Sequence, residues 1–203
     1  LTLKGKTLEV NNLYFKSAES DVYLKGSFYN PLGYLFFKQE NLAVDVLVKS
    51  QELRLDSFLQ DKNSSEPGTY SLAFTQQLDV RLQLEVESLS LATFKAQEIK
   101  GLLKIKNGRI SGEQISLKAH EGSYAGAFEL NPLAKQGYQL NAKLEANRIN
   151  MRQLFAGFNN FNQQTITANN LLGTGFIKTQ LSVNLNENLV LNPYSLNTQA
   201  NLR

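Results

Sequence analysis

The sequence predicts an almost all-β chain, folded as an elongated, curled antiparallel sheet or open groove that is built from repeated units and carries one or two short helices. Three observations lead to this fold class. Apolar and polar residues alternate along most of the chain, turn-forming residues separate the alternating stretches, and one order of elements recurs after roughly 100 residues. With 203 residues, of which 42% are hydrophobic and 19% charged, the chain has the composition of a folded protein.

The clearest strand is LDVRLQLEVESLSL, residues 78–91. Val80, Leu82, Leu84 and Val86 lie on one side of it, and polar or charged residues lie on the other, because successive side chains of a strand point to opposite faces. Near Ser88 the apolar positions change from even to odd numbers, which predicts a bulge or a turn. The same alternation is found at residues 22–28, 42–48, 115–119, 138–146 and 181–185.

Turn and helix signals divide these strands. Asn107-Gly108 predicts a two-residue hairpin, because a type I′ turn needs two residues that tolerate positive φ. Asn150 is expected to cap a short helix with Gln153 three residues further on, while the neighbouring Ile149 packs against Leu154. Asp56 is the expected N-cap of a similar turn of helix.

An internal repeat relates two parts of the chain. DVYLKGSFYN aligns with GSYAGAFELN, so that Gly26 matches Gly126 and Phe28 matches Phe128, and both copies continue with a strand and a short helix. Repeats of this kind stack because one copy alone cannot bury its apolar face. The predicted organisation is a first repeat unit at 1–60, a loop at 61–71, a second unit at 72–161, and a connection with the start of a further, truncated unit at 162–203.

Charge and composition narrow the classes of function. The net charge is +3 and the basic residues are spread along the chain, mostly at polar strand positions, which indicates a solvated face and no nucleic-acid partner. The absence of cysteine excludes a disulfide framework and fits both the cytosol and a bacterial periplasm. No apolar run approaches the roughly 20 residues that span a bilayer. We expect an internal fragment of a longer protein, with any signal or membrane anchor upstream.

The sequence indicates no catalytic site, no metal and no cofactor. His120 is the only histidine and cysteine is absent, which excludes zinc sites with several His or Cys ligands. We expect it to be a solvent-facing or hydrogen-bonded residue at a strand end. No phosphate-binding loop, nucleophile elbow or calcium loop occurs. Five aromatic residues are expected to pack in the core or to line an apolar wall: Tyr34, Phe36, Phe37, Phe158 and Phe161.

A longer pattern runs from Leu78 to Phe161. An alternating strand is followed by FKAQEIKG, a hairpin, a Gly-rich strand, the helix start NRINMRQLF and a further NNF element. In this order the chain resembles the AsmA family of bacterial envelope proteins, in the variety common in Bacteroidetes-like bacteria. Residues 1–60 resemble an earlier unit less closely, and residues 176–203 resemble an incomplete following unit. The matching motifs are patterns of strands and turns and carry no chemical signature.

The resemblance implies a function. Proteins of this family and their larger, TamB-like relatives are regarded as long curled β-sheets that are anchored at the inner membrane and conduct phospholipids across the periplasm. It implies for this chain a non-enzymatic periplasmic segment in the cell envelope of a Gram-negative bacterium, a phospholipid or other apolar ligand, and envelope proteins as further partners. The expected lipid-facing residues are Val80, Leu82, Leu84, Val86, Leu103, Ile105, Ile115, Leu117, Tyr124, Phe128, Leu140, Ala142 and Leu144, with Lys104, Lys106, Lys118 and Lys143 facing outward.

Two other interpretations remain open at this point. Alternating strands also build closed β-sandwiches, in which the same apolar residues meet across a core, and the chain would then be a structural or interaction domain of a cell-envelope protein. A glycan-binding or glycan-cleaving β-domain is a lesser alternative. It would need exposed aromatic residues clustered with carboxylates, a pattern that the sequence does not display.

Overall fold

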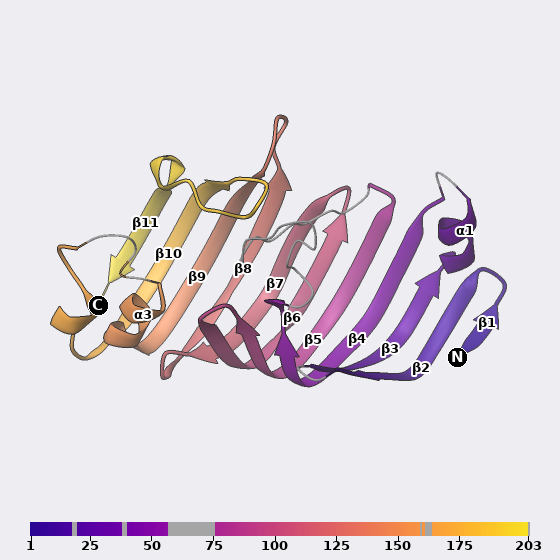
Figure 1. The fold of residues 1–203 in the computed structure, drawn as a ribbon, viewed down its shortest axis with the longest axis horizontal. Helices are drawn as coiled ribbons and strands as arrows, with labels where there is room; N and C mark the ends of the chain where they lie inside the picture. The colour runs from indigo at the N-terminus through magenta and orange to yellow at the C-terminus, as the bar shows by residue number, and fades with distance from the viewer. Residues whose placement is uncertain (18–19, 38–39, 57–75, 159, 161–163, 203) are drawn as a thin grey trace.

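The computed structural model describes residues 1–17, 20–37, 40–56, 76–158, 160 and 164–202. They form one mixed sheet of eleven strands, which neighbour one another in chain order (Figure 1). The strands are β1 (Thr2–Lys4), β2 (Thr7–Lys16), β3 (Asp21–Tyr29), β4 (Leu42–Arg54), β5 (Leu78–Leu91), β6 (Phe94–Lys106), β7 (Arg109–Ala119), β8 (Gly122–Pro132), β9 (Tyr138–Asn150), β10 (Thr174–Leu185) and β11 (Asn197–Leu202). The helical elements are α1 (Pro31–Phe36), α3 (Met151–Gly157), η2 (Ala168–Asn170) and η3 (Pro193–Ser195).

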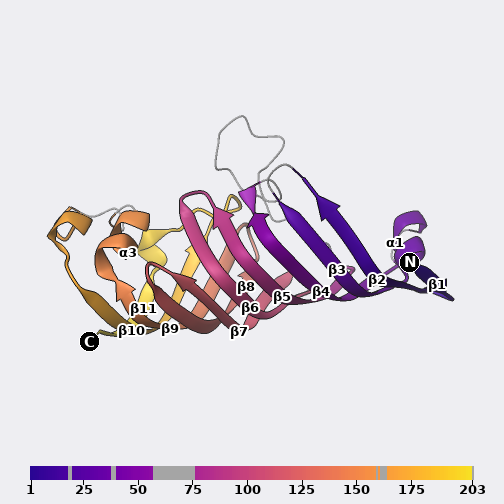
Figure 2. The same ribbon diagram turned by 90° about the horizontal axis from the view of Figure 1, so that it is seen from below.

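The sheet is curled and open. Its edge strands β1 and β11 lie at opposite ends and do not pair, so the sheet does not close into a barrel. Seen along its edge, the sheet curves into a trough, and α1 and α3 lie on the concave side (Figure 2). The predicted all-β, curled sheet with short helices is therefore confirmed. All described strands belong to this one sheet, so the two packed sheets of the sandwich alternative are not found among them.

The expectation of a purely antiparallel sheet is wrong at one place. Strands β4 and β5 pair in parallel, with Leu42 opposite Leu78 and Arg54 opposite Ser90, while every other neighbouring pair is antiparallel. A parallel pair requires the chain to return to the starting end of the strand before it enters the next one. Residues 57–75, which connect β4 to β5, lie outside the described residues. Side-chain alternation is the same in both directions of pairing, so the sequence pattern could not reveal it.

The best hairpin signal is confirmed. Asn107 and Gly108 have φ angles of 53° and 71° and connect β6 directly to β7. His120 and Glu121 form a second two-residue connection, between β7 and β8, with φ angles of 49° and 60°. Positive φ at both turn positions matches the right-handed twist of the flanking strands. These two turns fix the register of three consecutive strands.

The expected helix after β9 is also confirmed. The Asn150 side chain accepts a hydrogen bond from the Gln153 backbone N–H at 3.1 Å, and Ile149 and Leu154 are buried in one cluster with Ala146. The Gln153 side chain does not return to the cap residue, because its amide donates to Glu121 in the turn before β8 at 2.6 Å. Asp56, the expected N-cap of a second helix, is described, and its carboxylate accepts a hydrogen bond from the Ala92 N–H at 3.0 Å. The residues after it, where that helix was expected, lie outside the described residues.

Replacing Asn150 with alanine is expected to destabilise the protein by about 1 kcal/mol or slightly more. The change removes the acceptor for the Gln153 N–H and also the donor that reaches Glu121 at 2.9 Å. Asn150→Ser is the control, because serine keeps a cap acceptor, loses the donor to Glu121 and adds no charge beside that carboxylate. Urea unfolding curves measure both variants. Equal losses in the two variants would contradict a capping role.

Helix α1 was not foreseen. Pro31 occupies the first helical position, where its missing N–H costs nothing and its fixed φ suits the helix. Asn30 precedes the helix as its N-cap residue and has a φ of 59°. Its side-chain amide donates a hydrogen bond at 2.8 Å to Glu40, which follows the helix in the chain. The helix has no buried residue. Its apolar residues have the spacing of one helix face, but Leu32, Leu35 and Phe36 are all exposed.

The expected irregularity near Ser88 is not a turn. Strand β5 continues to Leu91, and its pairing with β6 keeps one register from Val86 opposite Ile99 to Leu89 opposite Ala96. Val86, Ala96 and Ile99 are buried in one cluster and the half-buried Leu89 packs against it, so both strands change the face of their apolar residues at the same level. Glu98 in β6 has a φ of 52°, which marks the irregularity on the partner strand. The ladder is preserved because the change occurs in both strands together.

The two matched glycines have the same surroundings. A Cβ atom on Gly26 would lie 2.1 Å from the Asp45 carbonyl oxygen of β4, and one on Gly126 would lie 2.2 Å from the Lys143 carbonyl oxygen of β9. This agreement fits the alignment of the two copies. The sheet runs on without a break from β4 to β5, and the loop predicted at 61–71 lies outside the described residues. The division into repeat units stays a prediction.

Candidate functional site: the apolar concave face

Strand register aligns apolar side chains into rows that cross the sheet. The first row takes one residue from each strand from β2 to β10: Leu8, Phe28, Val44, Val80, Ile105, Ile110, Leu130, Leu140 and Val183. Directly paired residues point to the same face of a sheet. The row is therefore an unbroken apolar strip across nine strands.

Further rows run beside the first on the same face. The second contains Val10, Gly26, Val46, Leu82, Leu103, Gly112, Phe128, Ala142 and Leu181. The third passes through Leu24, Val48, Leu84 and Gly101 and continues with Ile115, Gly126 and Leu144. A Cβ atom on Gly101 would touch Ile115, which joins the two parts of this row. A fourth level, nearer the ends of the strands, contains Val86, Leu117, Tyr124 and Ala146.

All thirteen residues expected to face a lipid lie on this one face. The first row contains Val80, Ile105 and Leu140, the second Leu82, Leu103, Phe128 and Ala142, the third Leu84, Ile115 and Leu144, and the fourth level Val86, Leu117 and Tyr124. Val86 and Ile105 are buried and the other eleven are half-buried. Half-burial means that the side chains touch their neighbours in the sheet while part of their surface stays open to a ligand.

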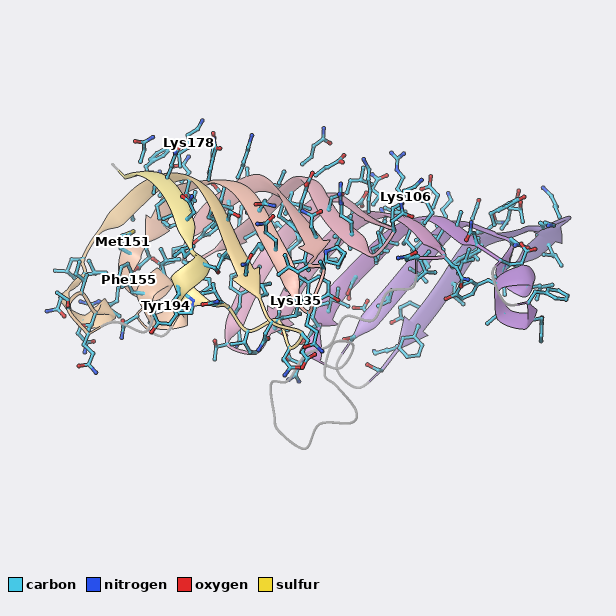
Figure 3. All side chains as sticks on the ribbon, turned by 90° about the horizontal axis from the view of Figure 1, so that it is seen from above. Lys106, Lys135, Met151, Phe155, Lys178 and Tyr194 are labelled. Atoms are coloured by element: carbon cyan, nitrogen blue, oxygen red, sulfur yellow. The ribbon has the colours of Figure 1, made fainter. Side chains whose placement is uncertain are left out.

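The opposite face is polar. The expected outward lysines lie there, and Lys104 pairs with Glu113 at 2.7 Å across the strands. Lys106 pairs with Asp79 and Lys118 with Glu98, so much of the charge on this face is compensated locally. Figure 3 shows Lys106 and Lys178 pointing away from the trough, whereas Met151 and Phe155 lie on its inner side. The sheet thus separates a charged convex surface from an apolar concave one.

Helix α3 covers the concave face at the β9 end. Leu154 packs with Ala146 and Ile149, and Tyr124, Met151 and Ile177 surround them. Glu121 holds the helix to the β7–β8 turn by accepting hydrogen bonds from Asn150 and Gln153. At the other ends of the strands, Leu185 and Leu189 pack on Ile105, Ile110 and Leu130. Between these two covers, the described residues add no further layer over the apolar rows.

His120 belongs to an aromatic cluster beside α3. Its Nδ1 lies 2.7 Å from the Tyr124 hydroxyl, and its ring centroid lies 6.0 Å from Phe94 and 6.1 Å from Phe158. The expectation of a hydrogen-bonded histidine at a strand end is confirmed. Burial lowers the pKa of His120 below its ordinary value of 6.5, because the charged ring loses water. Burial likewise raises the pKa of Tyr124 to about 12.

His120 should therefore titrate below pH 6.5 in the folded protein. A lowered folded-state pKa means that the contribution of the neutral ring to stability is complete above pH 6.5 and is lost as the pH falls through the folded-state value. Because His120 is the sole histidine, its ring proton gives a single NMR resonance whose titration reports this pKa. Tyr124→Phe is expected to leave the pKa lowered, since desolvation is the cause. A value at or above 6.5 would contradict the burial of the ring.

The aromatic residues outside the strands differ from expectation. Phe36 is 74% exposed and Phe37 is 67% exposed, so these two residues do not pack in a core, whereas Phe158 packs in the aromatic cluster with Phe94 and His120. Tyr34 is half-buried, and Phe161 lies outside the described residues. The core position expected for Phe36 and Phe37 is wrong because α1 lies at the rim of the sheet and has no second layer to pack against.

Some residues of the concave face were missed. Ile110 and Leu130 are buried in the first row and were not among the expected site residues. A signal was present for Ile110, because a two-residue turn at Asn107-Gly108 pairs Ile105 with Ile110. The shift of register between Gly112 and Ile115, where Gln114 has a φ of 51°, separates these residues from the alternation of the second half of β7.

Comparisons with known proteins add no relative: no family model, no curated protein and no solved structure matches the chain. Within the described part of the chain, no group of three or more His, Cys, Asp or Glu residues is placed to hold a metal ion. The helices described there are too short to span a bilayer. The fold and the concave face define the class of protein as a single-layer, open β-sheet with one continuous apolar surface.

Proposed function

We propose that the chain is a non-enzymatic segment of an AsmA-like envelope protein of a Gram-negative bacterium, and that its concave face holds and conducts phospholipid acyl chains between the inner and the outer membrane. One observation carries the proposal: the apolar rows continue across nine strands on the open side of an unclosed sheet. The described strands form one sheet and supply no second sheet to cover this surface, and large exposed apolar surfaces mark binding sites.

The dimensions suit an acyl chain. With strands about 4.8 Å apart, the rows from β2 to β10 extend about 38 Å. One acyl chain spans about half of the roughly 30 Å hydrocarbon core of a bilayer, so an acyl chain fits along the rows with room to move. None of the residues named in the four rows carries a charged side chain.

The energetics suit a conduit. Each methylene taken out of water gains about 0.8 kcal/mol, so ten buried methylenes gain about 8 kcal/mol. Apolar contact has no preferred direction, and adjacent positions along the rows offer nearly the same contact. A chain can therefore be held strongly as a whole while it slides past individual side chains. No nucleophile, metal or cofactor is needed for this function.

Lipid occupancy tests the proposal. The protein is purified from bacterial cells without detergent and examined by native mass spectrometry, and the bound material is extracted with organic solvent and analysed for phospholipid. We expect phospholipid in the wild type and in Arg81→Asp, whose side chain lies on the polar face, and its loss in Leu82→Asp, which places a carboxylate in the second row. Leu82→Ser is the milder variant if Leu82→Asp does not fold.

Circular dichroism confirms that each variant is folded before its occupancy is compared. A folded wild-type protein with a clean unliganded mass would contradict the proposal. Retention of phospholipid in Leu82→Asp at the wild-type level would also contradict it, because the ligand would then lie elsewhere on the protein.

A further inference from the structure

A second feature lies on the polar face, opposite the trough. One continuous polar row crosses β5 to β9, with each residue paired to the next: Ser88, Gln97, Lys118, Ser123 and Asn147. These residues line a shallow depression of about 850 Å³, together with Lys95, Arg148 and the turn before β8. The row offers hydroxyl, amide and ammonium donors from five strands. It belongs to no part of the apolar site.

The charges of this depression do not balance inside it. Lys118 pairs with Glu98 at 2.6 Å, and the Glu121 carboxylate is occupied by the side-chain amides of Asn150 and Gln153. Lys95 and Arg148 line the same depression, and within the described residues neither side chain has an ion-pair or hydrogen-bond partner. Two unpaired cations therefore lie beside the polar row, while Glu121 keeps its negative charge with its oxygens held by neutral amides.

The backbone conformation at Arg148 also places polar side chains on the convex surface. Arg148 has a φ of 54°, a conformation that costs a non-glycine residue of the order of 1 kcal/mol or more. Ala146 and Ile149 are both buried, while Asn147 and Arg148 between them are exposed. The extra residue of this bulge thus leaves both polar side chains on the convex surface. The register of β10 shifts at the same level, between Gly175 and Ile177. Bulges re-aim side chains in this way near binding sites.

We propose that this depression binds the phosphate group of a phosphate ester, with Arg148 and Lys95 supplying the charge and Gln97, Ser123 and Asn147 supplying further hydrogen bonds. A phosphate has several acceptor oxygens and up to two negative charges, which matches a site with many donors and two free cations. The guanidinium of Arg148 can donate two parallel hydrogen bonds to one phosphate. The site is on the face opposite the apolar rows, so it does not depend on acyl-chain binding.

Binding of inorganic phosphate and of glycerol phosphate, measured by calorimetry and by NMR titration, tests this site. The double variant Lys95→Gln with Arg148→Asn removes both free cations, and asparagine tolerates the positive φ at position 148. The double variant is expected to weaken glycerol phosphate binding by about tenfold or more. The control is Lys143→Gln, an exposed lysine of the same face outside the depression, which should change the affinity less than about twofold.

Flotation with phosphatidylglycerol vesicles separates the two sources of such a phosphate. Binding of glycerol phosphate together with flotation that the double variant loses assigns the site to a lipid headgroup, while glycerol phosphate binding without flotation assigns it to a soluble phosphate ester. Absence of binding by the folded wild type at millimolar concentrations would overturn the proposal. Equal weakening by Lys143→Gln would overturn it as well, because the attraction would then be the diffuse charge of the whole face.

Discussion

Gly126→Ala is expected to destabilise the fold by about 2–4 kcal/mol. The added Cβ atom would lie 2.2 Å from the Lys143 carbonyl oxygen of the neighbouring strand, a contact that real Cβ atoms do not make. Relief requires β8 and β9 to separate in the middle of a ladder that pairs them from Ser123 to Pro132. Backbone atoms cannot rotate away as a side chain would, so the cost falls on the hydrogen bonds of the sheet. Chemical denaturation measures the loss.

Gly173→Ala separates this steric effect from the conformational freedom of glycine. Gly173 has a φ of 92°, and a Cβ atom there meets nothing within 4 Å. Its replacement should cost about 1 kcal/mol through backbone strain alone. Gly126 has no positive φ, so its loss of stability reports the close approach of two strands. If the Gly126 variant were as stable as the wild type, the close packing of β8 against β9 would be wrong.

Leu144→Asp should destabilise the protein by about 3 kcal/mol or more, whereas Lys143→Asp should change its stability by no more than about 0.5 kcal/mol. Leu144 is half-buried in the third apolar row, opposite Gly126 and Thr179. A carboxylate there loses part of its water, and among the described residues no cation lies in the row to compensate its charge. Lys143 is exposed on the other face and pairs with Ala127 and Gln180, which are uncharged.

The two substitutions are adjacent in sequence and introduce the same residue, so their difference depends on the face of the sheet alone. Thermal unfolding and urea unfolding both measure this difference. Equal tolerance of aspartate at the two positions would show that the assignment of faces is incorrect. Since the alternation of β9 sets this assignment, the same result would also remove Leu140 and Ala142 from the concave face.

Local chemistry made much of this structure predictable. The strict alternation of Val80 to Val86 assigns faces because the side-chain period of a strand is two, and the pairing places the expected residues of four other strands on the same face. The Asn107-Gly108 turn and the Asn150 cap depend on two or three consecutive residues and are found where the sequence places them. Short-range stereochemistry decides these features.

Long-range features of the fold could not be predicted from the sequence. Parallel pairing of β4 with β5 depends on the path of the chain between residues 56 and 76, and a strand carries no mark of its direction. The change of apolar face near Ser88 was visible in β5, but only the partner residue Glu98 shows why the ladder stays in register. Whether the apolar faces meet a second sheet is also a property of the whole chain, because sandwiches and open sheets share the same alternation.

The choice between lipid and solvent at the concave face can be measured residue by residue. A photoreactive benzoyl-phenylalanine is placed at position 128 in the second row or at the adjacent position 127 on the convex face, and the protein is irradiated in bacterial cells grown with labelled phosphate. Both positions are in β8 and differ only in the face that they occupy. We expect a labelled lipid adduct at position 128 and none at position 127. Equal labelling at both positions, or none at position 128 in a folded protein, would contradict a lipid-binding concave face.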